Sequence, residues 1–359
     1  MHVELKKPSD LSEAERDAWR EFVSADPALG SPYFTIEFAE CCEEARSDTR
    51  VLVARERGAI AGFLPMQTGH FGYVRPLAGP LGDTHGVIAA PGRQADLQTW
   101  LRRAHIPVFE FHGALATQTP FREHASHLEG SWVMDLSEGF DAWMERRNSV
   151  DVKAMRNIRT RYNRLDKAGA RHEFVMSDED PEALAAMIRW KREQYAQTGV
   201  FDVFSVPWTR RLLDAVLRRR GDEFSGICSS LRVDGRIVAV HVGMASARMC
   251  QFWFPAFDRD FARVSPGLLM LVETARSCAG LGHEGIELGQ GEFRFKKELS
   301  SYQIPVAAGH FTNPSMMGLM RRGSAALMRS MEAAPEGAVA RLTGKAMRKI
   351  DRLAGFYAA

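Results

Sequence analysis

Residues 265–270, S-P-G-L-L-M, and residues 286–297, I-E-L-G-Q-G-E-F-R-F-K-K, decide the fold of the second half of this chain. Ser265 is a residue type that caps helices, Pro266 suits a first helical turn, and Gly267 lets a ligand approach the backbone. Helix starts of this kind bind anions because their first amide groups have no partner inside the helix. The stretch predicts a phosphate or diphosphate site beside a strand with a polar end. The alternative is that S-P-G merely begins a helix.

The residues before this stretch predict helices followed by a hairpin. Apolar periodicity indicates helices over residues 150–168, 181–197 and 207–219. I-C-S-S-L-R-V and R-I-V-A-V-H-V-G flank Asp234-Gly235, which supplies the positive φ angles of a tight turn. A strand over 249–254, a helix from S-P-G to about residue 279 and a strand over 285–288 follow. The predicted order is helices, three antiparallel strands, a helix and a strand.

The first half repeats this order more faintly. V-L-V-A, R-E-R-G and A-I-A-G-F-L-P-M predict a hairpin, followed by a strand near 71–75, a helix near 94–104 and the strand V-F-E-F. The repeat predicts a duplicated α/β unit; the alternative is one large mixed sheet. We expect domains over residues 1–145 and 146–314. Residues 315–359 then form a basic, amphipathic helical tail.

Composition limits the class of protein. The chain has 359 residues, of which 45% are hydrophobic and 26% charged, as in ordinary globular domains. No apolar run is long enough to cross a bilayer, and the N-terminus is not a signal peptide. The five cysteines form no C-x-x-C pair, which favours reduced thiols over a zinc site. We expect a cytoplasmic protein without a metal, with peripheral contact at the inner membrane as an option.

Charge is concentrated in two places. The net charge is +2, yet residues 146–171 carry +7 and residues 315–359 carry +5, so the remainder carries −10. Such clustering predicts local anion contacts and argues against a protein that coats DNA. The tail could lie on a membrane surface or on a partner, or pack on its own domain.

Taken together, several motifs resemble one family. R-V-D-G-R-I-V-A-V-H-V-G, F-W-F-P-A-F-D, S-P-G-L-L and G-I-E-L-G-Q-G-E-F-R-F-K-K are similar to the CelD-type GNAT-like acyltransferases, relatives of the FemAB-like transferases. S-P-Y-F-T-I-E-F, G-P-L-G-D-T-H-G-V-I-A-A-P-G and K-A-M-R-N-I-R-T-R-Y-N-R-L extend the resemblance over roughly residues 30–312. The family is associated with exopolysaccharide biosynthesis.

The resemblance implies a fold and three candidate functions. The fold is α/β (α+β), with two tandem GNAT-like domains that each have a mixed, mainly antiparallel sheet. The leading function is transfer of an acyl group from acetyl-CoA to an amino sugar or lipid-linked sugar. A FemAB-like aminoacyl transfer from tRNA is the second. The third is a non-catalytic protein that binds an anionic effector such as cyclic di-GMP.

One motif departs from the family pattern. Where the family commonly has Asp-x-Gly-x-Gly-x-x-x-Tyr-Lys, this chain has Glu287, Gly289, Gly291, Phe295 and Lys296. Glutamate keeps the carboxylate but moves it outward by one methylene. Phenylalanine removes a hydroxyl that could donate a proton. The usual GNAT diphosphate signature, Gln/Arg-x-x-Gly-x-Gly/Ala, is also missing.

The candidates for the donor site follow from the helix start and the resemblance. Ser265, Pro266, Gly267 and Leu268 would face the donor's diphosphate, and Lys296 would neutralise a phosphate because its ordinary pKa keeps it charged. Lys153 and Arg156 lie on one predicted helical face and are candidates for an anionic substrate; the alternative is an ordinary solvated face.

Four residues are candidates for proton transfer or acceptor binding. His241 titrates near neutrality, and Glu287 ends an apolar strand where carboxylates often reach into a cleft. A core histidine, and a partner for Lys296 or Lys297, are the structural alternatives. Asp83 as a catalytic residue and His85 as a substrate ligand lie in G-D-T-H-G, which turn chemistry alone also explains.

Overall fold

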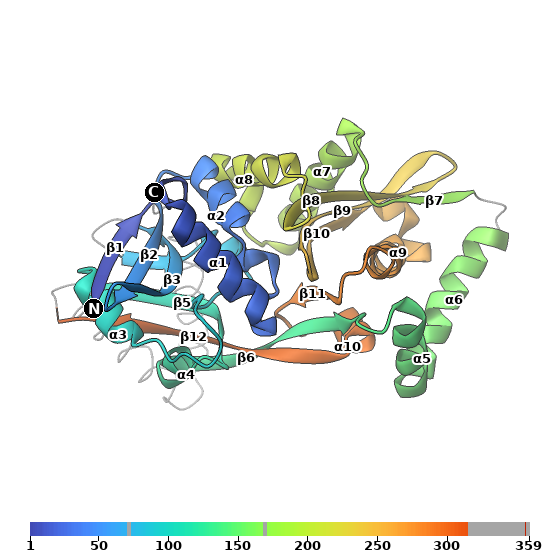
Figure 1. Ribbon diagram of the computed structural model, residues 1–359. Helices are drawn as coiled ribbons and strands as arrows, with labels where there is room; N and C mark the ends of the chain where they lie inside the picture. The colour runs from blue at the N-terminus through green and yellow to red at the C-terminus, as the bar shows by residue number, and fades with distance from the viewer. Residues whose placement is uncertain (70–72, 168–170, 315–355, 357–359) are drawn as a thin grey trace, which may run out of the picture. The chain divides into compact units, whose positions relative to one another are not determined.

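The computed structural model describes residues 1–69, 73–167, 171–314 and 356. The chain divides into two compact units, coloured by position along the chain in Figure 1. Unit 1 comprises Met1–Leu29, Ala39–Glu129 and Pro305–Ala359, and unit 2 comprises Gly30–Phe38 and Gly130–Ile304. The expected boundary near Glu145 falls inside a helix of unit 2. The predicted helical tail lies outside the described residues apart from Phe356.

Unit 1 contains a sheet with the strand order β1-β2-β3-β4-β5-β12. Its neighbouring strands are antiparallel where β1 meets β2, β2 meets β3, β3 meets β4 and β12 meets β5, whereas β4 and β5 are parallel. The elements are β1 (His2–Lys6), α1 (Glu13–Ala25), α2 (Ile36–Ala45, begun in unit 2), β2 (Thr49–Glu56), β3 (Ala59–Thr68), β4 (Tyr73–Pro76), α3 (Leu97–Arg103), β5 (Val108–Leu115), α4 (Thr119–Glu123) and β12 (Tyr302–Thr312).

Unit 2 contains a sheet with the order β7-β8-β9-β10-β11-β6. Here β10 and β11 are the parallel pair, and the other neighbours are antiparallel. The elements are β6 (Ala125–Asp135, begun in unit 1), α5 (Phe140–Val150), α6 (Val152–Lys167), β7 (His172–Val175), α7 (Pro181–Thr198), α8 (Pro207–Arg218), β8 (Phe224–Val233), β9 (Arg236–Ser246), β10 (Met249–Phe257), α9 (Pro266–Gly280), β11 (Gly285–Gly289) and α10 (Arg294–Leu299).

The predicted duplication is confirmed by these strand orders. In each unit a hairpin, a third strand, a helix and a parallel fourth strand follow one another, as β2-β3-β4-α3-β5 and as β8-β9-β10-α9-β11. The predicted hairpin turn is also confirmed, because Asp234 and Gly235 have φ angles of 50° and 78°. The sixth strand of each sheet could not be read from the repeat, because β6 follows β5 in sequence but pairs with β11.

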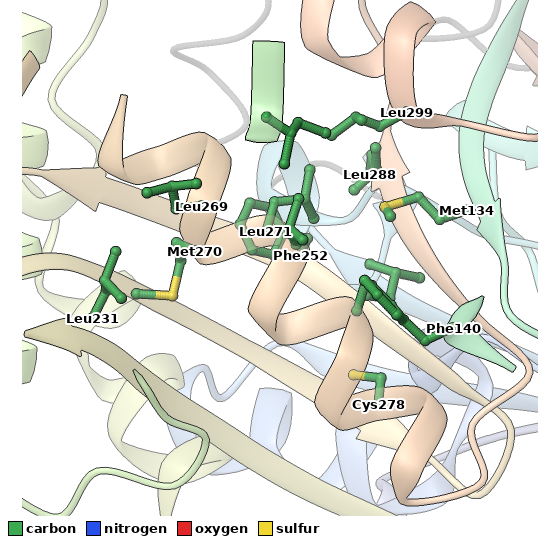
Figure 2. Close-up of a cluster of buried hydrophobic side chains, with 14 of the residues drawn as sticks. Met134, Phe140, Leu231, Phe252, Leu269, Met270, Leu271, Cys278, Leu288 and Leu299 are labelled. Carbon is green, nitrogen blue, oxygen red and sulfur yellow. The ribbon is translucent and has the colours of Figure 1, made fainter. Parts of the chain in front are cut away.

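The core of unit 2 lies between its sheet and α9. Leu269 and Leu271 of α9 are buried together with Phe252 of β10 and Leu288 of β11, as Figure 2 shows. Helices α5 and α6 also contact α9, whereas α7 and α8 cover the opposite face of β8–β10 (Figure 1). Helices therefore contact β10 from both faces of the sheet, and α9 also contacts β11. This arrangement positions the candidate site.

Candidate functional site

The candidate site begins where the parallel strands β10 and β11 separate. They pair only from Met249 to Gln251 on β10 and from Gly285 to Glu287 on β11. Beyond these pairs both strands are irregular. Two residues of β10 oppose one residue of β9 after Gln251, and the register of β11 against β6 shifts after Glu287. Bulges of this kind bend a strand and redirect its side chains, so the two strands diverge.

Gly243 of β9 explains why the bulge on β10 forms at this point. Gln251 pairs with Met244 and Phe254 with Val242, so Gly243 alone opposes the two intervening residues. A Cβ atom on Gly243 would lie 2.2 Å from the carbonyl oxygen of Gln251. Only glycine tolerates such a close backbone approach. The bulge places Phe252 and Trp253 in the wall of a cavity.

This cavity, which we call the aromatic cavity, has a volume of about 520 Å³. The diverging strands, the residue before α10 and the first turn of α10 supply its apolar wall: Phe252, Trp253, Phe257, Leu288, Phe293 and Phe295. Helix α7 closes another side with Trp190, Lys191, Glu193 and Gln194. Cavities of this size, mostly apolar with a few polar groups, are typical ligand sites.

A second hollow, the basic cavity, adjoins the first and has a volume of about 820 Å³. It shares Ser265, Leu268, Phe293 and Phe295 with the aromatic cavity. Its other wall is one face of α6, where the i, i+3, i+4 spacing brings together Lys153, Arg156, Asn157, Thr160 and Arg161. The buried residues Met155, Ile158 and Leu165 form the other face of the helix. The helix is therefore amphipathic, with cations toward the hollow.

Three contacts hold α6 against α9 and the segment that precedes it. The guanidinium groups of Arg161 and Arg164 donate to the carbonyl oxygen of Arg263, at 2.8 and 3.1 Å. The hydroxyl of Tyr162 donates to the carboxylate of Glu273 on α9. Among the described residues, no partner is recorded for the buried Nε of Arg161, or for the side chains of Lys153 and Arg156. This face therefore offers positive charge that ion pairs do not neutralise.

The start of α9 differs in detail from the sequence expectation. Ser265 does not cap the helix with its side chain, and its backbone is left-handed, with φ 53° and ψ 58°. Pro266 does not explain this conformation, because Asp180 and Val206 also precede a proline at a helix start and are extended. The amide of Leu268 donates to the Ser265 carbonyl at 2.9 Å and so is not available to a ligand. Gly267 is left with an amide for which no partner is recorded among the described residues.

Lys296 lies at the far wall of the aromatic cavity. It is buried, its ammonium group donates to the carbonyl oxygen of Gln290, and its Nζ lies 5.4 Å from the centre of the Phe293 ring. A hydrogen bond from α5 holds the end of α10, because the Arg147 guanidinium donates to the Glu298 carbonyl at 2.7 Å. Cations at a helix C-terminus satisfy carbonyls that lack internal partners. The position of Lys296 is thus set by the fold.

The two carboxylate and imidazole candidates of unit 2 lie behind the cavity wall. Glu287 is only 2% exposed, and its carboxylate accepts a hydrogen bond of 2.6 Å from Ser31. His241 is fully buried, bonds Ser229 at 3.2 Å through Nδ1 and stacks on Phe252 with 4.2 Å between ring centres. Burial lowers the pKa of His241 to about 3, against a smaller opposing effect of the Gln251 backbone. Neither side chain lines the two cavities.

Asp83 and His85 lie in unit 1 and so belong to a different compact unit from the cavities. The backbone of His85 bonds β5 through Gly113 and Leu115, and its ring packs near Phe109 and Phe121. Burial, with a smaller contribution from His112, lowers the pKa of His85 to about 3. The environment of His85 is therefore that of a neutral core histidine.

Sequence reasoning missed the contribution of α7. Trp190, Lys191, Glu193 and Gln194 occupy the C-terminal half of a helix that was predicted as a helix without a functional role. Burial lowers the pKa of Lys191 to about 8. No local pattern marks these residues, because α7 approaches the cavity only through the packing of the sheet.

The comparisons agree with this geometry. Residues 152–297 match a family model described as an acetyltransferase (GNAT) domain. No curated protein is similar enough in sequence to match the chain. Among solved structures, a FemX structure is similar with a TM-score of 0.59 and 10% identity, over 89% of this chain and 99% of that one.

Two further structures share the fold at low identity. The C-terminal domain of a putative lysylphosphatidylglycerol synthetase from Agrobacterium fabrum has a TM-score of 0.53 and 14% identity, over 88% of this chain and 97% of that domain. A tandem GNAT protein from the clavulanic acid biosynthesis pathway has a TM-score of 0.50 and 11% identity, over 88% and 100%. The fold is thus that of two tandem GNAT-like domains.

The site and the family match together define the class of protein. Residues 152–297 form a GNAT acetyltransferase domain, and the cavities lie within this range or at its edge. The protein is therefore an enzyme, a GNAT-type acyltransferase. In the part of the chain that the structure describes, no helix is long and apolar enough to cross a membrane. Within the same part, no group of three His, Cys, Asp or Glu residues is arranged to hold a metal ion.

Proposed function

We propose that the protein transfers an acetyl group from acetyl-CoA to the amine of an amino sugar or sugar-lipid precursor in cell-envelope polysaccharide synthesis. One observation carries the proposal: the aromatic cavity opens where β10 and β11 diverge and adjoins a cation-lined cavity at the start of α9. A donor with phosphates at one end and an apolar arm at the other matches these two environments in order. The resemblance to CelD-type proteins supports the sugar acceptor.

The residues fit such a donor at its anionic end. Lys153 and Arg156 face the basic cavity without a recorded partner in the described chain, and Arg161 keeps a buried Nε in the same position. The amide of Gly267 adds a donor at a helix N-terminus, where the helix dipole also favours an anion. Lysine and arginine side chains bind phosphate groups by charge-assisted hydrogen bonds. These groups would hold the donor's phosphates.

The aromatic cavity would hold the reactive end of the donor. Acetyl-CoA supplies an activated thioester when bound, so the protein has to orient it, exclude water and stabilise negative charge. Phe252, Leu288 and Phe295 give the wall that excludes water. Lys191 and Lys296 are the ammonium groups of this wall. A cation in a partly apolar site stabilises developing negative charge more strongly than it does in water.

The proposal includes the location of the reaction. A soluble amino sugar would be acetylated in the cytoplasm, and a lipid-linked sugar at the inner face of the membrane. The basic composition of residues 315–359 suits peripheral contact with such a surface. This segment lies outside the described residues apart from Phe356.

Acetyl-CoA binding and thiol release test the proposal directly. Acetyl-CoA should raise the melting temperature of the protein in a concentration-dependent manner, because a ligand of the native state stabilises it. Adding glucosamine to the complex should release free CoA thiol. Neither melting shift nor thiol release with acetyl-CoA would contradict the proposed donor.

Aminoacyl transfer from tRNA is the second candidate. The open, unpaired basic face of α6 suits the phosphates of an RNA end as well as those of CoA, and the FemX fold is similar. The two donors can be separated by competition. An aminoacylated RNA hairpin that transfers its amino acid, with no thiol release from acetyl-CoA, would establish this candidate in place of the first.

A further inference from the structure

A third hollow adjoins the aromatic cavity on the side of α7. This polar cavity has a volume of about 560 Å³ and lies between α7 and the hairpin of β8 and β9. Trp190 and Glu193 line both it and the aromatic cavity. In unit 2, α7 and α9 cover opposite faces of β8–β10 (Figure 1). The basic, aromatic and polar cavities thus form a series that runs from the α9 side to the α7 side of the sheet.

The charges of the polar cavity are almost fully paired. Arg232 bonds Asp178 at 2.8 Å and Asp180 at 3.0 Å. Arg236 bonds Asp258 at 2.5 Å, and Arg189 bonds Glu182 at 3.2 Å. These pairs leave one carboxylate of the lining, Glu193, for which no hydrogen bond or ion pair is recorded with any described residue. Glu193 is exposed to solvent and lies at the junction with the aromatic cavity.

Trp190 gives the same junction an apolar surface. It is half-buried, and the guanidinium carbon of Arg189 lies 5.8 Å from its ring centre. An indole beside a ring of polar side chains provides a flat apolar platform and hydrogen-bonding groups together. This combination suits a compact polar molecule with one apolar face. The free carboxylate adjacent to the platform favours a cationic group on that molecule.

We propose that the polar cavity is the acceptor site, and that Glu193 binds the acceptor's ammonium group at the mouth of the aromatic cavity. The inference rests on the proposed acyl-CoA chemistry of that cavity. The acceptor class is a primary amine on a small polar scaffold, such as an amino sugar. An acceptor in the polar cavity would lie on the α7 side of the aromatic cavity, and the donor's phosphates would lie on the α6 side. The acceptor nitrogen and the donor thioester would then meet where β10 and β11 diverge.

The proton balance gives Glu193 a second role. The ammonium first loses one proton to the Glu193 carboxylate, which passes it to water. The neutral amine then attacks the thioester carbon; the C–N bond forms, the C–S bond breaks, and the electron pair leaves with sulfur. The second proton of the nitrogen ends on that sulfur. The products are an amide and a thiol, with no oxidant or reductant required.

The test compares three carboxylate variants with glucosamine and acetyl-CoA as the probes. Glu193→Gln should raise the KM for glucosamine about tenfold, because it removes a charged hydrogen-bond partner, and should lower kcat, because an amide cannot accept the ammonium proton. The KM for acetyl-CoA and the melting temperature should not change. Glu193→Asp should restore part of the loss. Asp214→Asn removes an exposed carboxylate of α8 that lines none of the three cavities and should behave as wild type.

Binding measured without turnover separates this inference from the proposed function. Saturation-transfer NMR reports glucosamine binding to the wild type and to both Gln and Asn variants, with N-acetylglucosamine as the ligand that lacks the amine. Equal KM and equal binding in wild type and Glu193→Gln would overturn the inference and leave acetyl transfer standing. Binding that is lost in Glu193→Gln, with no thiol release by the wild type, would support the acceptor site and contradict the donor. No glucosamine binding to the wild type would overturn the inference.

Discussion

Each of the two units contains one pair of parallel strands that separate, β4 and β5 in unit 1 and β10 and β11 in unit 2. The units differ in whether a chain segment fills the space between the separated strands. In unit 1, β4 pairs with β5 only at Tyr73 and Val74. Beyond that point the chain returns, and the segment from His85 to Ile88 bonds to Gly113 and Leu115 of β5 on one side and to Phe63 of β3 on the other. In unit 2 no such segment fills the corresponding place in the described chain, and the aromatic cavity opens there.

The comparison teaches where function is placed in a duplicated fold. The closed divergence of unit 1 needs close backbone contact, and a Cβ on Gly62 would lie 2.9 Å from the Ile88 carbonyl. The open divergence of unit 2 needs a bulge instead, and Gly243 permits it. Both units bury a hydrophobic core, but unit 2 also leaves two strands apart and lines the space with aromatic and basic side chains.

The largest effect on stability is expected when a side chain is added at Gly243, opposite the β10 bulge. Gly243→Ala should lower the free energy of unfolding by about 3 kcal/mol, since the new methyl group would overlap the Gln251 carbonyl. Urea denaturation measures the change. Gly280→Ala in α9 is the control, because nothing lies within 4 Å of its Cβ position. A fully stable Gly243→Ala protein would show that the bulge does not depend on this glycine.

Each unit also buries one histidine, and these predict how stability depends on pH. Burial lowers the pKa of His85 and of His241 to about 3. The unfolded chain therefore binds more protons than the folded chain between about pH 6.5 and 3, and stability falls as pH falls through this window. The loss approaches about 1.4 kcal/mol per pH unit for each histidine.

Urea denaturation at pH 7 and pH 5, values on either side of the unfolded pKa of about 6.5, tests this expectation. His85→Leu should remove the contribution of His85 and leave those of His241 and His283, whose pKa burial also lowers, so the difference in stability between the two conditions should shrink. His127→Gln, at an exposed position of β6, should keep the wild-type difference. An unchanged difference in His85→Leu would contradict a neutral, buried His85.

A smaller effect, on acetyl-CoA affinity, is expected at the basic cavity. Among the described residues, this cavity adjoins the space between the separated strands of unit 2. The double variant Lys153→Gln/Arg156→Gln should weaken acetyl-CoA binding about tenfold and make it less sensitive to salt. Isothermal titration at two salt concentrations measures both changes. Arg159→Gln lies on the same helix but does not line the cavity, and its affinity should match wild type. An equal loss in Arg159→Gln would indicate a general charge effect.

The smallest effect is expected at Phe295. Phe295→Tyr adds the hydroxyl that is common at this position in the CelD-type family, which the chain resembles. The substitution should change the free energy of unfolding by less than about 0.5 kcal/mol. Because Phe295 serves as an apolar wall shared by both cavities, acetyl-CoA affinity should change less than about twofold. Thiol-release kinetics give the second readout. A tenfold rise in kcat would show that a hydroxyl proton donor is catalytically useful in this site.

Local sequence predicted much of the fold. The hairpin at Asp234-Gly235, helices α6 to α9 and the duplicated strand order follow from patterns of a few residues. The swap of β6 and β12 was not predicted, because each pairs with a strand of the other half of the sequence. Strand partners that are distant in sequence leave no local signature.

The candidate site was predicted in part. The start of α9 and the basic face of α6 line cavities, and the predicted residues Gly267, Lys153, Arg156 and Lys296 are among the lining residues. Their roles in binding stay predictions. The predicted side-chain cap of Ser265 was wrong, because the Ser265 backbone is left-handed and its side chain makes no capping hydrogen bond. Trp190 and Glu193 were missed because they line the aromatic cavity only when α7 packs on the sheet near the space between β10 and β11.

The sequence by itself determined helices α6 to α9, the hairpin at Asp234-Gly235, the repeated order of the elements and the residue types at the start of α9. It did so because helix periodicity, turn residues and capping act over a few neighbouring positions. Only the tertiary structure decided that the divergence is filled in unit 1 and open in unit 2, and which side chains meet there. That decision depends on backbone approaches at Gly62 and Gly243 between strands that pair across the sheet. Close packing between elements, and not local preference, fixes such approaches.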